Sequence, residues 1–286
     1  MLMARRTCVR NALLCAATAL FPASLQAAGR PVNAGEANAS PETHGSKLEE
    51  RAKLDLVIAN RILAYQQVVD AYGHVSLRHP DNPQKFLMAW SRSPALVEAG
   101  DIMQFRLDGA VIGEDRRPTY IERHIHAAIY REQPAVNAVV HAHASEVLPF
   151  TVGSVPLRPV IHSAGVISET IPVWDIRDQF GDTNLLVSDG QQGDDLVRRM
   201  GGSNVVLMRG HGFAAAGVNL IEVLRIAVYL RENAKVLQEA LRLGDITYLS
   251  AGELEAVRSI DPASPALKRA WEYWATEAGV ADLLEH

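Results

Sequence analysis

The sequence predicts one α/β domain in which a central, largely antiparallel sheet is flanked by helices. Two long segments, at 48–72 and 220–244, carry apolar residues at helical spacing, and the region between them contains short apolar runs separated by turn residues. The chain has 286 residues, of which 48% are hydrophobic, and this is enough to bury one large core.

The first half of the domain is predicted to be a helix followed by a series of hairpins. Leu54, Val57, Ile58 and Ile62 mark the buried stripe of the first helix, and Gly73 is expected to end it. Four strand-like runs follow this helix, at 74–79, 86–90, 102–107 and, less regularly, 109–113. The short connections between these runs favour antiparallel pairing.

The second half is predicted to alternate helices with buried strands. Helices are expected at 119–133, at 145–153, in the later part of 178–201 and at 220–244. Strands are expected at 137–144, at 156–162 and within 204–212, where the apolar run NVVLM precedes a turn flanked by glycines. From Leu249 the chain is expected to form one or two further helices, which include Trp271, Tyr273 and Trp274.

Residues 1–27 have the pattern of a cleaved signal peptide. Positive charges at Arg5, Arg6 and Arg10 precede the apolar stretch 11–21, which is too short for a stable membrane anchor. The pattern predicts export to the periplasm. The alternative is a start codon placed too far upstream, which would leave the protein in the cytoplasm.

The rest of the chain is predicted to divide into a flexible linker at 28–47, a domain at 48–248 and a helical tail at 249–286. Both cysteines, Cys8 and Cys15, lie in the signal segment, so a metal site in the mature chain must use histidines and carboxylates. The formal net charge is −5, and no dense cluster of Lys and Arg indicates a nucleic-acid partner.

A pair of histidines in the predicted strand NAVVHAHA is the first candidate for metal binding. His141 and His143 are two residues apart, and side chains at this spacing point to the same face of a strand. They can therefore bind one ion together, with Zn–N bonds of about 2.0–2.1 Å. The alternative is two unrelated, half-buried histidines.

Two further residues are candidates for the same site. His211 follows an apolar strand, and Gly210 and Gly212 on either side permit unusual backbone angles and close approach. Glu122 shares a helix face with His126 and is either a fourth ligand or a general acid/base. The alternatives are a solvent-exposed turn histidine and an ordinary glutamate favoured by the helix dipole.

The order of the segments YIERHIHAAIY, NAVVHAHAS and VVLMRGHG, followed by a long helix, resembles the class II aldolase/adducin family over about residues 54–241. The resemblance implies a three-layer α/β/α fold and a homotetramer with sites between subunits. It also implies one divalent ion per subunit, Zn²⁺ first and Mn²⁺ second, bound by His141, His143 and His211. Glu122 would be the acid/base and a further ligand.

Three short motifs depart from the sugar-phosphate aldolases of this family, which hold a phosphate with small residues. The corresponding places here read Gly73-His74-Val75-Ser76, Ser91-Arg92-Ser93 and Tyr120-Ile121, which suit a phosphate nest poorly. The variants are similar to the family's branch of aromatic-carboxylate decarboxylases. That similarity implies contacts to a carboxylate or phenolate from His74, Arg92, Tyr120 and His162. Alternatively, Arg92 is a surface charge and His162 a hydrogen-bonded core residue.

The resemblance therefore implies a metal-dependent lyase that acts on a small-molecule substrate by aldol cleavage or decarboxylation. Both reactions leave a carbanion next to a carbonyl, and a divalent metal stabilises it as an enolate. Two alternatives are a non-catalytic, adducin-like interaction domain, which would lack the metal ligands, and a metal-dependent hydrolase, in which an open three-histidine site activates water.

Overall fold

The computed structural model describes residues 46–260 and 264–285. The predicted signal peptide at 1–27 lies outside these residues, as does the predicted linker at 28–47 apart from its last two positions. The described residues fall in one structural unit. No helix within them is long and apolar enough to span a membrane.

The described residues form a sheet of seven strands in the order β3-β2-β1-β4-β7-β6-β5. Neighbouring strands are antiparallel except β5 and β6, which are parallel, so the predicted, largely antiparallel sheet is confirmed. The strands are β1 (His74–Arg78), β2 (Lys85–Ala89), β3 (Ile102–Arg106), β4 (Ala138–Ala142), β5 (Val173–Trp174), β6 (Val205–Met208) and β7 (Gly212–Gly217).

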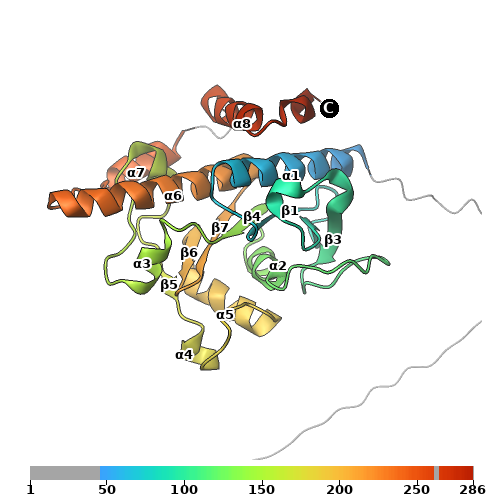
Figure 1. The fold of residues 1–286 in the computed structure, drawn as a ribbon, viewed down its shortest axis with the longest axis horizontal. Coiled ribbons are helices and arrows are strands. Elements are labelled where there is room, and N and C mark those ends of the chain that lie inside the picture. Colours follow the sequence, from blue (N-terminus) through green and yellow to red (C-terminus); the bar gives the residue numbers. More distant parts are fainter. Residues whose placement is uncertain (1–45, 261–263, 286) are drawn as a thin grey trace, which may run out of the picture. The chain divides into compact units, whose positions relative to one another are not determined.

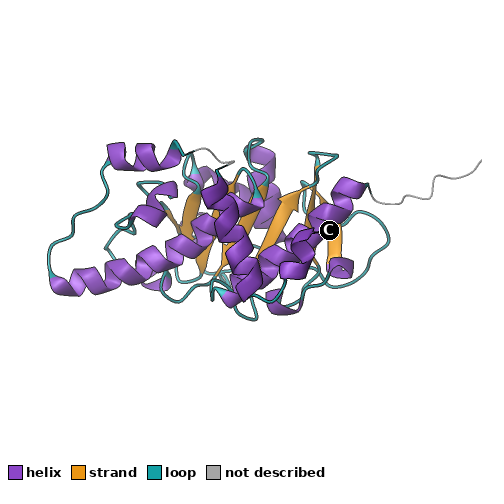
Figure 2. Ribbon diagram, turned by 90° about the horizontal axis from the view of Figure 1, so that it is seen from above, coloured by secondary structure: helices purple, strands orange, loops and turns teal. Residues whose placement is uncertain are grey.

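Helices cover both faces of this sheet, which gives three layers (Figure 1). The layer on one face contains α1 (Lys47–Tyr65) and α6 (Leu220–Leu243), and helices cross over the strands when the molecule is seen from above (Figure 2). The helix α8 (Pro265–Glu277) packs on the outer side of α1 and α6, away from the sheet (Figure 1). The other layer contains α2 (Arg123–Glu132) and α5 (Gly190–Met200). The shorter helices are α3 (Leu148–Val152), α4 (Arg177–Phe180) and α7 (Ala251–Arg258).

Alternation along the strands separates two apolar cores. On β4, Ala138 and Val140 pack in the core with α1 and α6, whereas Val139 packs in the core with α2 and α5. His141 follows this alternation and therefore lies on the α2 side. Central β4 thus positions a polar side chain where it can meet the start of α2.

Several elements differ from the prediction, and one strand was not predicted. The first helix ends at Tyr65 rather than near residue 72, because Gln67 has a left-handed φ of 56° that a helix cannot contain. The run at 109–113 forms only an isolated bridge between Val111 and Phe105. Finally, β7 was not predicted, because its sequence GFAAAG lacks the β-branched residues typical of strands.

The strand predicted at 156–162 is absent. Pro156 and Pro159 have no N–H to donate to a sheet. Asn233 of α6 takes the place of a neighbouring strand: its Oδ1 accepts from the N–H of Val160 at 2.8 Å, and its Nδ2 donates to the carbonyl of Arg158 at 2.9 Å. The segment therefore continues into the 3₁₀ turn His162–Val166 as a loop.

Candidate metal centre

Four of the predicted site residues converge from separate elements. Glu122 lies at the N-cap position of α2, His141 on β4, His143 just beyond β4, and His211 in the turn between β6 and β7. β7 pairs with β4 so that Phe213 lies opposite Ala142. The adjacent turn therefore brings His211 against the end of β4.

The ligand atoms of these four side chains lie within 4.8 Å of one another. The Nε2 atom of His143 is 2.9 Å from Nε2 of His141 and 3.1 Å from Nε2 of His211. Oε2 of Glu122 is 3.2 Å and 3.4 Å from the same two atoms of His141 and His211. Such separations suit one ion at the centre, because each bond to it would measure about 2 Å.

Hydrogen bonds on the far side of two rings show which nitrogens face the centre without a hydrogen. Nδ1 of His141 lies 3.0 Å from the carbonyl oxygen of Phe213, and Nδ1 of His211 lies 3.0 Å from that of Leu185. A carbonyl only accepts, so both Nδ1 atoms carry a hydrogen, and in the neutral form of each ring Nε2 is bare. The lone pairs of these bare nitrogens repel one another and the nearby carboxylate oxygen of Glu122. A bound cation relieves this repulsion.

The segment before α5 orients two members of the cluster. Leu185 adopts a left-handed φ of 68°, which is rare for a bulky residue, and its carbonyl accepts from His211. The N–H of Val187 donates to Oε1 of Glu122 at 3.1 Å. Glu122 caps no helix N–H with its side chain, so its carboxylate serves the cluster rather than the helix terminus.

The glycines that flank His211 have the two properties expected of them. Gly210 has a φ of 65°, in the left-handed region. A Cβ on Gly212 would lie 2.2 Å from the carbonyl oxygen of Ala142 and 3.0 Å from Cδ2 of His143. Only glycine at this position lets the β6–β7 turn approach the His141–His143 pair so closely.

Burial and neighbouring charges set the ionisation of the cluster. Burial, together with His141 and His211, lowers the pKa of His143 to about 3, so this imidazole is neutral and free to bind a cation. Burial alone would raise the pKa of Glu122, but the charge and hydrogen bonds of His141 and His211 in their protonated forms outweigh it and lower the pKa well below its usual range. Glu122 is therefore a carboxylate in neutral solution.

A family model described as "Class II Aldolase and Adducin N-terminal domain" matches residues 55–237, which is more than half of the chain. The chain belongs to the class II aldolase and adducin family.

Relatives and solved structures agree with this assignment. The chain is 32% identical to decarboxylase tropJ from Talaromyces stipitatus over 246 residues, which are 78% of this chain and 92% of that protein. It is 29% identical to a 3,4-dihydroxyphthalate decarboxylase from Arthrobacter keyseri, over 66% of this chain and 76% of that protein. An aldolase II superfamily protein from Pseudomonas syringae has a TM-score of 0.70 at 19% identity, over 84% of this chain and 96% of that one. The three-layer class II aldolase fold is thus confirmed.

Two of the predicted substrate-binding residues border the four candidate metal ligands. His74 lies opposite His141 in the β1–β4 pairing, and its ring centroid is 5.1 Å from that of His141. The ring of Tyr120 packs on His74 with centroids 4.5 Å apart. Burial raises the pKa of Tyr120 to about 12, so the phenol is neutral. These two rings form an aromatic wall beside the cluster.

The other two predicted substrate contacts have different surroundings. The Nε atom of Arg92 lies 3.2 Å from Oδ2 of Asp101 and donates to the carbonyl of Leu96 at 2.7 Å. The main-chain carbonyl of Arg92 accepts from the hydroxyl of Tyr120. His162 is exposed and lines a groove with residues of α7, and no contact joins it to the four ligands.

Sequence reasoning missed a buried chain of hydrogen bonds behind His74. Nδ1 of His74 is 2.7 Å from Nε2 of His126, and Nδ1 of His126 is 2.6 Å from Oγ of Ser76. Oγ of Ser76 is in turn 2.7 Å from the hydroxyl of Tyr130. The i, i+2 spacing on β1 and the i, i+4 spacing on α2 were visible in the sequence, but the pairing between the two elements was not.

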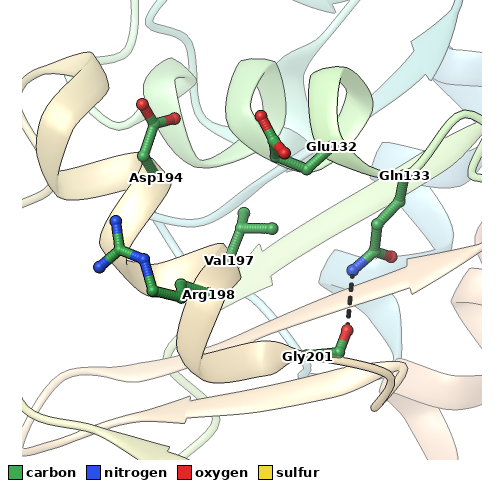
Figure 3. A pocket seen from close by; sticks show the side chains of 6 residues that line it. All are labelled: Glu132, Gln133, Asp194, Val197, Arg198 and Gly201. Atoms are coloured by element: carbon green, nitrogen blue, oxygen red, sulfur yellow. Dashed lines mark hydrogen bonds between the residues drawn. The ribbon is translucent and has the colours of Figure 1, made fainter. Parts of the chain in front are cut away.

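A separate cleft of about 440 Å³ lies on the outside of the α2–α5 pair (Figure 3). Nε2 of Gln133 donates to the carbonyl of Gly201 across it at 3.2 Å. None of the four ligands lines this cleft. Its lining residues are Glu132, Gln133, Asp194, Val197, Arg198 and Gly201.

Proposed function

We propose that this protein is a metal-dependent lyase that removes a carboxyl group from a hydroxylated aromatic carboxylate. The observation that carries the proposal is the position of the aromatic wall of His74 and Tyr120 directly beside the cluster of three histidines and one glutamate. A flat ring fits such a wall. The names of two relatives, both decarboxylases, support the same reaction class.

His141, His143 and His211 would hold one divalent ion, with Glu122 as a further ligand or as its neighbour. When bound, the ion supplies Lewis-acid stabilisation of the electron pair that the departing carboxyl group leaves behind. The neutral imidazoles contribute no charge of their own, and this leaves the ion's charge available to the substrate.

The chain's own residues bind and orient the substrate. The ring of Tyr120 is held in place by its hydroxyl's bond to the carbonyl of Arg92 and by its contact with His74. Glu122 is an anchored carboxylate, with Oε1 held by the N–H of Val187, that can take the proton of a substrate hydroxyl on Oε2 and pass it to the ring carbon that loses the carboxyl group. The contacts of Arg92 to Asp101 and Leu96 both use its Nε atom, which orients the guanidinium and leaves the Nη groups to meet a substrate carboxylate.

A sugar phosphate fits this surface poorly. A phosphate needs compact hydroxyls and free main-chain N–H groups, whereas Tyr120 presents a neutral ring whose hydroxyl is already bonded. The complete set of four ligands also argues against a non-catalytic, adducin-like role. The decarboxylase relatives argue against a hydrolase.

The test is a metal analysis of the purified protein followed by a substrate panel. We expect about one divalent ion per chain and release of CO₂ from a hydroxylated benzene- or pyridine-dicarboxylate. Cleavage of fuculose 1-phosphate or ribulose 5-phosphate with kcat/KM of about 10⁴ M⁻¹s⁻¹ or more, the low end for ordinary enzymes, would overturn the assignment.

Glu122→Gln tests the role of the carboxylate within this reaction. We expect turnover to fall by about 10²- to 10⁴-fold, the usual range for loss of a group that moves a proton, while three histidines retain most of the metal. Turnover and bound metal are measured on the same preparation. Wild-type turnover in this variant would show that Glu122 takes no part in the chemistry.

A further inference from the structure

The hydrogen-bond chain behind His74 has a direction that the structure allows one to work out. His74, Ser76, His126 and Tyr130 are all at least 95% buried, so each polar atom in the chain needs its partner. No carboxylate belongs to the chain. Both rings are buried with no carboxylate bonded to them, so each is a neutral imidazole with one N–H and one bare nitrogen, as the 2.7 Å contact between Nδ1 of His74 and Nε2 of His126 requires.

Two directions give the hydroxyl hydrogens of Ser76 and Tyr130 an acceptor; a Ser76 oxygen that accepted from both His126 and Tyr130 would leave its own buried hydrogen without one among the described residues. In the first, Tyr130 donates to Ser76, Ser76 donates to Nδ1 of His126, and Nε2 of His126 donates to Nδ1 of His74. His74 then carries its hydrogen on Nε2. In the second, every bond is reversed, and His74 presents a bare Nε2.

The far end of the chain distinguishes the two directions. In the reversed chain, the hydroxyl hydrogen of Tyr130 must go to the carbonyl oxygen of Asn137, which is 3.5 Å away. That distance is beyond the usual range for an O–H···O bond. In the first direction the same hydrogen lies on the 2.7 Å contact to Ser76. The first direction satisfies every short contact.

The near end of the hydrogen-bond chain is the ring of His74, which lies beside the candidate metal ligand His141. Nε2 of His74 has no hydrogen-bond partner among the described residues, although the ring lies between Tyr120 and His141. An N–H at this place can bond an oxygen of a molecule held beside the four ligands.

We propose that Ser76, His126 and Tyr130 are positioning residues that fix the ring of His74 and hold its hydrogen on Nε2, so that His74 donates a hydrogen bond to a carboxylate or phenolate oxygen of the substrate. The identity of that oxygen rests on the proposed decarboxylase function. The direction of the chain does not. His74 thereby selects substrates with an acceptor oxygen next to the reacting group, and the selection acts through residues that touch no substrate.

The direct test reads the position of the hydrogen on His74. The metal-loaded protein is labelled with ¹⁵N-histidine, and two-bond ¹H–¹⁵N spectra are assigned by comparison with His74→Gln. We expect the wild-type ring of His74 to carry its hydrogen on Nε2, and Ser76→Ala to give a mixture of both tautomers. A wild-type His74 with its hydrogen on Nδ1 would overturn the proposal, whether or not the protein is a decarboxylase.

The kinetic test uses the substrate that the panel identifies. Ser76→Ala should lower kcat/KM by about 10- to 100-fold, the range typical of partners that orient a functional imidazole, with bound metal unchanged. Tyr130→Phe should cause a smaller loss, because Ser76 keeps its own hydrogen for His126. Ser168→Ala is the matched control, because it removes a hydroxyl bonded to Asn204 instead.

Wild-type kcat/KM and an unchanged His74 tautomer in Ser76→Ala would contradict the proposal. If Ser76→Ala does not fold, Ser76→Cys replaces it, because a thiol is a weaker donor in the same place. If no substrate in the panel is turned over and the tautomer is as expected, the positioning chain stands and the decarboxylase function fails.

Discussion

The two faces of the sheet use the same strands for different purposes. On β1, Val75 faces α1 and the apolar core, whereas its neighbours His74 and Ser76 face α2. On β4, Val140 faces the apolar core, and His141 faces the candidate metal ligands Glu122, His143 and His211. A period of two residues thus lets a single strand contribute to stability on one side and to chemistry on the other.

The difference shows in how buried side chains are stabilised. The face toward α1 and α6 is packed mainly by apolar side chains. On the α2 face, every buried polar side chain around the cluster has a hydrogen-bond partner, as a low-dielectric interior requires. Substitutions on the two faces should therefore affect different measurements.

The largest expected effect separates adjacent residues of β4. His141→Ala should abolish stoichiometric metal binding and lower turnover by about 10³-fold or more, because a Lewis acid contributes several kcal/mol. Val140→Ala should instead lower the free energy of unfolding by about 2–3 kcal/mol and keep the metal. Metal content and urea unfolding are measured on both variants. Equal loss of metal in the two would mean that the faces are not separable.

Gly212→Ala should have a smaller but mixed effect, because this residue joins the two functions. Its Cβ would meet the carbonyl oxygen of Ala142 at 2.2 Å, and β4 and β7 would have to move apart. We expect a loss of about 1–3 kcal/mol in stability and weaker metal binding.

Gly100→Ala is the control for that variant, since its Cβ would have no atom within 4 Å. It should change stability by less than about 0.5 kcal/mol. Unfolding curves measure the stability of the two variants, and metal titrations measure their affinity for the ion. Unchanged metal affinity in Gly212→Ala would show that the β6–β7 turn tolerates displacement.

The smallest effect is a change in the pH dependence of stability. Burial lowers the pKa of His126 well below 6.5, whereas its unfolded form titrates near 6.5. Below that pH the unfolded state binds the extra proton, so this histidine's contribution to stability is present above pH 6.5 and is lost as the pH falls. Each such histidine adds about 1.4 kcal/mol per pH unit to the slope.

His126→Gln should therefore reduce the slope of unfolding free energy between pH 6 and pH 5 by about 1.4 kcal/mol per pH unit. Urea unfolding in the presence of EDTA measures it, with the wild-type protein as reference. A variant slope equal to the wild-type slope would show that His126 is protonated in the folded protein.

Much of the candidate site could be predicted because its signals are local. The spacing of His141 and His143 fixes a shared face once the segment is a strand, and the glycines around His211 indicate a tight approach. The long apolar periodicity of α6 fixed its bounds almost to the residue. These features depend on a few neighbouring residues, which a sequence displays directly.

The remaining features depend on tertiary contacts. β7 is a strand because it lies between β4 and β6, not because of its small side chains. Ser76 and His126 are functional candidates only because β1 and α2 face each other. His162 follows the segment that Asn233 of α6 bonds at Val160. In this position His162 lies in a groove with residues of α7 and not beside the cluster.

The hydrogen bonds of Asn233 to the loop before His162 have a consequence for the substitutions that this loop tolerates. Both of its hydrogen bonds, to Val160 and Arg158, are to main-chain atoms, so no side chain of the loop is recognised. Any loop sequence with the same backbone path satisfies them, apart from a proline at position 160. Evolution or a library can therefore vary the exposed side chains of the loop, because Asn233 and the N–H of Leu249, which donates to the carbonyl of Pro159, hold only its main chain.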